Sequence, residues 1–169
     1  MPTITKIADY IGRYQVAKDS YSKQVIQQYI DENESKLIYQ LLGTELGALF
    51  IADLDVNGVP QTQRFIDIYN SFALEDDCKQ YISDGLKDYL LGLIYFDYVR
   101  NTNTYNSQLG NKSSLTENSE YAGNLIHDLS QRYNKGIATG KNIQWYCDCH
   151  KPEDYPEFKG VELEYTHWL

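Results

Sequence analysis

The sequence predicts a mainly α-helical fold: a small bundle of about four to five helices, followed by an extended, partly β or irregular C-terminal tail. Two observations favour this class. Apolar residues recur at helical spacing in several segments, which are separated by polar stretches rich in Gly, Asn and Ser. That period is absent from residues 141–169, which hold both tryptophans. A length of 169 residues suits one helical domain over 1–140, with 141–169 as an aromatic and acidic arm.

The first half of the chain contains three predicted helices. The spacing predicts a first helix from Tyr21 to Ile30, with Ser20 or Ser22 as its cap. The polar run 31–35 predicts a break, and an apolar stripe from Leu37 to Phe50 predicts a second helix. Pro60 then opens a short helix over 61–69.

The second half is predicted to contain the central helix and one more. Residues 71–77 are expected to form a loop, and the most apolar helix is expected from Tyr81 to Tyr98. Residues 101–114 are expected to be an exposed connection, and the capping-box pattern at 114–117 opens the last helix. Gly136 and Gly140 are expected to end that helix. The arm beyond it is interpreted as either a strap on the bundle or a contact with a neighbouring subunit.

Composition bears on the kinds of partner. The chain has 16 Tyr against 5 Phe and 2 Trp, and tyrosine suits half-buried surfaces where proteins meet. A formal net charge of −9 argues against binding nucleic acid through the bulk surface.

The longest apolar stretch, 89–98, is too short to span a bilayer, so no membrane association is expected. The three cysteines are too few for a disulfide framework.

Residues 53–58 partly match a calcium-binding loop. Asp53, Asp55 and Asn57 supply oxygens at positions one, three and five, and Gly58 stands at position six. The twelfth position, however, is Arg64 where a chelating carboxylate is required. The interpretation favoured by the sequence is therefore a turn with Asn-Gly at its tip.

A second candidate metal site combines Cys147, Cys149 and His150. Two thiolates separated by one residue chelate a tetrahedral zinc ion poorly, and no second cysteine pair exists in the sequence. The alternation around these cysteines is equally well explained by a strand with one packed face. No cofactor is therefore expected.

Motifs for catalysis are also missing from the sequence. Neither a Gly-x-Ser-x-Gly turn nor a nucleotide-binding glycine loop is present, and His127 falls on the polar side of its predicted helix. We therefore expect a protein that is not an enzyme.

The N-terminal helices carry a family resemblance. The stretch 28–34 reads QYIDENE and 36–46 reads KLIYQLLGTEL, which resembles an "I-D-x-x-E…L…LLG…L" pattern in the head-to-tail connector proteins of tailed bacteriophages. The helix 85–100 and the connection 101–119, with Leu109-Gly110 and Glu117-Asn118, are similar to that family's later helices. The likeness spans roughly residues 20–135 and is closest to the connector proteins of crAss-like phages.

This resemblance implies a structural virion protein. Such a protein forms a homo-oligomeric ring between the portal and a tail or further connector protein, and lines the DNA path without catalysis or specific DNA binding. Its place is the virion, and the host cytoplasm during assembly. The residues expected to contact partners are Tyr29, Tyr39, Tyr98, Trp145 and Trp168. The alternatives are another helical protein–protein interaction module, or a metal-binding protein that uses residues 53–58 or 147–150.

Overall fold

Five α-helices dominate the residues that the computed structural model describes, which are 2–76, 79–102, 104–107, 110–113 and 121–166. The helices are α1 (Ser20–Leu42), α2 (Thr44–Ala52), α3 (Gln63–Tyr69), α4 (Leu86–Thr102) and α5 (Tyr121–Trp145). Short 3-10 turns, η1 (Ile7–Asp9) and η2 (Gly12–Tyr14), precede them, and a π-helical turn, η3 (Tyr146–His150), follows α5. The predicted mainly helical class is confirmed. No helix in the described part of the chain is long and apolar enough to cross a membrane.

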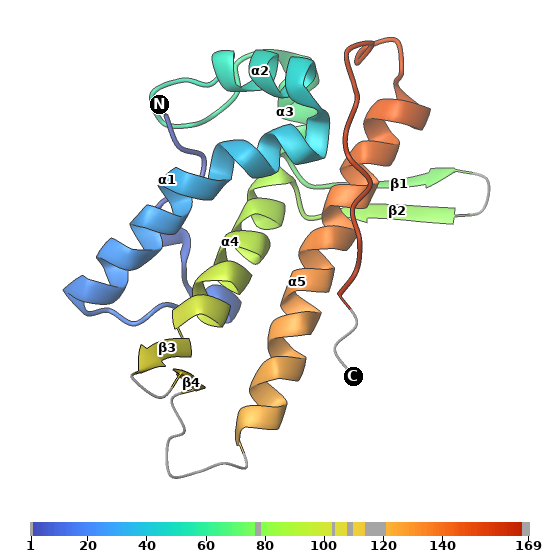
Figure 1. Cartoon of the computed structure of the whole chain (residues 1–169). Coiled ribbons are helices and arrows are strands. Elements are labelled where there is room, and N and C mark those ends of the chain that lie inside the picture. The colour runs from blue at the N-terminus through green and yellow to red at the C-terminus, as the bar shows by residue number, and fades with distance from the viewer. Residues whose placement is uncertain (1, 77–78, 103, 108–109, 114–120, 167–169) are drawn as a thin grey trace.

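Helix α4 is the centre of the bundle, as the sequence predicts. Figure 1 shows α4 between α1 and α5. Its residues from Tyr89 to Phe96 are all buried, so neighbouring elements surround the middle of the helix. A helix that is apolar on every side is stable only in such a position.

Helix α1 is continuous through residues 31–35, so the predicted break is wrong. Ile26, Ile30, Glu34 and Ile38 follow one another at four-residue spacing, and all four are buried. Glu34 occupies a core position because it accepts hydrogen bonds from the N-terminal segment, and the other acidic residues of the run face solvent. The chain turns instead at Gly43, whose φ of 87° suits glycine.

The start of α1 and the approach to α3 differ slightly from the prediction. Asp19 caps α1 by accepting a hydrogen bond from the Ser22 backbone N–H at 2.8 Å, so neither Ser20 nor Ser22 is the cap. Helix α3 begins at Gln63, after Pro60 has paired with Leu54 in an isolated bridge.

Helix α5 passes through both glycines that were expected to end it. A Cβ atom at Gly136 would lie 2.8 Å from Leu93 Cδ1, and one at Gly140 would lie 2.7 Å from Leu163 Cδ1. The two glycines stand four residues apart on one face of the helix and allow its neighbours to approach closely. The expected domain boundary at residue 140 therefore falls inside α5.

Two antiparallel hairpins replace segments that were predicted as loops. β1 (Phe72–Asp76) pairs with β2 (Lys79–Ser83), where a loop at 71–77 and the start of the central helix were expected. β3 (Thr104–Ser107) pairs with β4 (Gly110–Ser113) within the expected connection. The predicted capping box at 114–117 lies outside the described residues. In the first hairpin the side chains alternate between two faces, a period of two that overrides the weak helical pattern.

The C-terminal strap, residues 151–166, runs back along α5 without regular secondary structure (Figure 1). Tyr155 and Leu163 in the strap are buried in the core. The strap also reaches α1, because the Lys159 and Val161 backbone N–H groups donate to the carbonyls of Leu42 and Gln40 at 3.2 and 2.9 Å. Of the two interpretations left open for the arm, the described part is a strap on its own bundle.

Candidate interaction surfaces

The Asp53–Gly58 segment is a hydrogen-bonded turn that joins α2 to α3. Asp53 Oδ2 accepts from the Gln61 and Thr62 backbone N–H groups at 2.7 and 2.8 Å. Asp55 Oδ1 accepts from the Val59 and Asn57 N–H groups, both at 2.8 Å, and these bonds lower the pKa of Asp55 below its usual range. Both carboxylates therefore stabilise the turn by accepting hydrogen bonds from its own backbone. The turn interpretation is confirmed, and Gly58 has the expected positive φ of 80°.

The Cys147–His150 segment is a π-helical turn, so the predicted strand is wrong. The turn places Cys147 in the core, where burial raises the pKa of its thiol, and leaves Cys149 and His150 exposed. The His150 ring instead stacks on Trp145, with centroids 5.4 Å apart. Across the described residues, no group of three or more His, Cys, Asp or Glu side chains is placed to hold a metal ion.

The residues expected to contact partners mainly contact other parts of this chain. Tyr29 on α1 meets Tyr98 on α4 edge to face, with ring centroids 5.9 Å apart. Trp145 stacks on Tyr81 of β2 at 3.5 Å and an interplanar angle of 3°. Tyr39 is exposed and lies over Gly47. Trp168 lies outside the described residues.

The β1–β2 hairpin exposes one of its two faces. The inner face packs on the C-terminal end of α5 and on η3, because Tyr81 contacts Trp145 and Phe72 contacts Tyr146. The outer face carries the cross-strand pairs Ala73–Ile82 and Glu75–Gln80, and all four residues are exposed. We call these four residues the hairpin face, whereas Asp76, at the end of β1, lies opposite Lys79 on the other side of the hairpin. Figure 1 shows the hairpin projecting past α5.

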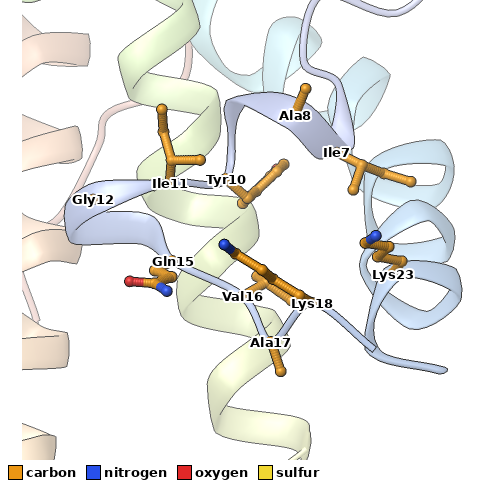
Figure 2. Close-up of a pocket in the computed structure, with 10 residues that line it drawn as sticks. All are labelled: Ile7, Ala8, Tyr10, Ile11, Gly12, Gln15, Val16, Ala17, Lys18 and Lys23. Atoms are coloured by element: carbon orange, nitrogen blue, oxygen red, sulfur yellow. The ribbon is translucent and has the colours of Figure 1, made fainter. Parts of the chain in front are cut away.

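A pocket of about 600 Å³ lies under the N-terminal segment, between η1, η2 and the start of α1. Figure 2 shows the segment curving around it, with Lys23 on the α1 side. We call it the N-terminal pocket, and its lining residues are Ile7, Ala8, Tyr10, Ile11, Gly12, Gln15, Val16, Ala17, Lys18 and Lys23. Its walls are mostly apolar, and the Ile11 side chain is 70% exposed.

The pocket carries positive charge in an otherwise acidic protein. Lys18 and Lys23 both line it and both are exposed, and none of its lining residues is acidic. The nearby acidic side chains have other partners. Asp9 forms an ion pair with Lys87 at 2.8 Å, and Asp19 caps α1. Within the described residues, no ion pair engages either lysine.

A buried carboxylate holds the segment that forms this pocket. Glu34 accepts hydrogen bonds from the Ile4 N–H at 2.8 Å, from the Thr5 N–H at 2.9 Å and from the Thr5 hydroxyl at 2.6 Å. Further along, Tyr14 is anchored to α4, where its hydroxyl donates to Asp88 at 3.3 Å. The segment is therefore fixed at both ends of the pocket.

Neither the pocket nor the hairpin face could be predicted from the residue pattern. Residues 7–18 show no clear period, and what lines the pocket depends on how the segment packs against α1 and α4. One signal in the sequence was the pair Lys18 and Lys23, which flank the start of the first predicted helix in a chain with a net charge of −9. Comparisons with models of protein families, with curated proteins and with solved structures found no match.

Proposed function

We propose that this chain is a structural, non-catalytic subunit of a homo-oligomeric ring, of the head-to-tail connector type found between the portal and tail of phages. The observation that carries the proposal is a pair of exposed surfaces of different character, far apart on one bundle. The N-terminal pocket is apolar and basic, and the hairpin face is apolar with one exposed carboxylate, Glu75.

The positions of the two surfaces favour head-to-tail association. In the view of Figure 1, the hairpin strands extend away from the bundle on the right, and the N-terminal segment lies at the left beside α1 and α4. A contact between two different patches is heterologous, and repeating it closes a ring when the rotation between neighbours allows. A contact of one patch with itself would stop at a dimer.

The overall charge suits a ring around DNA. A formal net charge of −9 disfavours strong phosphate binding, so DNA can slide through a ring of such subunits instead of adhering to it. The tyrosine-rich composition and the sequence resemblance in residues 20–135 support the same proposal.

The test uses the full chain, first alone and then mixed with a portal protein from the same genome. Light scattering after size exclusion, with electron microscopy of the same fractions, should reveal rings of one size or rings seated on the portal. The matched control is the portal protein alone. A chain that stays monomeric at every concentration, with and without the portal, would overturn the proposal and favour another helical interaction module.

A further inference from the structure

We infer that the hairpin face of one subunit docks into the N-terminal pocket of a second copy of this chain. This inference rests on the proposed ring and names the contact that would build it. It follows from the complementary charge and apolar content of the two surfaces, which lie on opposite sides of the molecule in Figure 1.

The charges match in sign. The pocket offers Lys18 and Lys23, and the hairpin face offers Glu75. All three side chains are exposed, and no ion pair within the described residues engages any of them. Opposite charges on two patches steer encounter and fix which patch meets which.

The apolar parts match as well. On the hairpin face, Ile82 is 51% exposed and lies beside Ala73, directly next to the Glu75–Gln80 pair. In the pocket, Ile7 lies beside Lys23, and Ile11 lines the opposite side (Figure 2). A volume of about 600 Å³ can hold a few side chains such as Ile82 and Ala73.

The hairpin is also held in a form ready to dock. Tyr81 stacks on Trp145, and the Asn142 amide donates to the Ile82 carbonyl at 2.5 Å, so α5 supports the inner face and leaves the outer face free. A two-stranded hairpin alone is marginally stable, and this support reduces the entropy lost on binding.

A charge-exchange experiment tests the contact. Two variants of the full chain are prepared: Lys18→Glu with Lys23→Glu, and Glu75→Lys. In sedimentation velocity, each variant alone should need about tenfold or more concentration to assemble, because like charges then meet. An equal mixture of the two should assemble like the wild type, since each altered surface finds its complement on the other variant.

Matched controls carry the same charge changes elsewhere. Lys36→Glu with Lys159→Glu, and Glu153→Lys, alter exposed residues outside both surfaces and should leave assembly unchanged. Circular dichroism checks that every variant is folded. If the wild type assembles but the surface variants behave like their controls, the docking inference is overturned and the ring proposal stands. If the mixture fails to recover assembly, the pairing of these two surfaces is also overturned.

Discussion

Glu34 is the residue on which the N-terminal segment depends. Its side chain is buried in α1 and is surrounded by donors from Ile4 and Thr5. A buried carboxylate is tolerated only when hydrogen bonds replace the water that it loses, and three bonds do so here. One side chain therefore joins the first residues of the chain to the core.

Replacing Glu34 by Ala should lower the free energy of unfolding by about 2–4 kcal/mol, because the substitution leaves the Ile4 and Thr5 N–H groups without their acceptor. Urea unfolding followed by circular dichroism measures the change. Glu32→Ala, at an exposed position of the same helix, is the control and should change stability by less than about 0.5 kcal/mol. Equal effects of the two substitutions would contradict the role given to Glu34.

The hydrogen bonds to Asp55 predict that the turn after α2 is sensitive to acid. The hydrogen bond from the Val59 N–H, with that from Asn57, lowers the pKa of Asp55 in the folded state. A group with a lowered folded pKa stabilises the fold above its unfolded pKa of about 3.9, and this contribution is lost as the pH falls through the folded value. Asp55→Asn should therefore make stability fall less steeply below about pH 4.

Urea unfolding at a series of acidic pH values measures that slope. Glu32→Gln removes one exposed carboxylate from the middle of α1 and serves as the control. An Asp55→Asn protein whose stability falls as steeply as the wild type over this range would show that the turn is not acid-sensitive.

At the scale of elements, the C-terminal strap is part of the core. Leu163 is buried against Gly140 of α5, and Gln144 Nε2 donates to the Val161 carbonyl at 2.8 Å. The strap also bonds to α1 through Lys159 and Val161. It therefore ties α1 and α5 together at the end of the bundle where α5 supports the hairpin.

Leu163→Ala should destabilise the fold by about 2–4 kcal/mol, since it opens a cavity beside Gly140. Val161→Ala, in the same strap but with its side chain 57% exposed, should change stability by less than about 0.5 kcal/mol. Thermal and urea unfolding of both variants compare them directly. A Leu163→Ala protein as stable as Val161→Ala would mean that the strap is not anchored in the core.

Helices could be predicted from the sequence where apolar residues recur regularly. The prediction was wrong where a residue's role depends on a partner far away in the chain. Helix α3 was found from Pro60 near its start, and α4 was found from the helical spacing of its many apolar residues. Glu34 hid the continuity of α1, since its partners Ile4 and Thr5 lie about thirty residues away. Gly140 was interpreted as a helix end because close packing against Leu163 is invisible in a local window.

The same distinction between local pattern and distant packing applies to the candidate sites. The turn at 53–58 could be recognised because its ligand pattern fails locally at Arg64. The N-terminal pocket could not, because its walls come from η1, η2 and α1, and only their packing brings Ile7 near Lys23. The hairpin face escaped notice because its strands were short and were partly assigned to the central helix.

At the scale of the whole molecule, charge pairing between subunits should make assembly sensitive to salt. Raising the ionic strength from about 0.1 M to about 1 M shortens the Debye length from about 10 Å to about 3 Å, which weakens attraction between exposed charges. Sedimentation velocity at both salt concentrations should therefore detect fewer assembled subunits at high salt. Assembly that is unchanged or stronger at high salt would indicate a contact without paired charges.

The head-to-tail geometry is the central claim, and native mass spectrometry of the wild-type chain over a range of concentrations tests it most directly. Two different docking surfaces on each subunit predict growth to one closed ring with a single subunit number above two. Besides the ring, the spectra should show mainly free subunits. Partial rings should be rare, because the subunits at their ends make one contact, whereas every subunit of a closed ring makes two. A chain that remains monomeric, or that stops at a dimer, would contradict the claim.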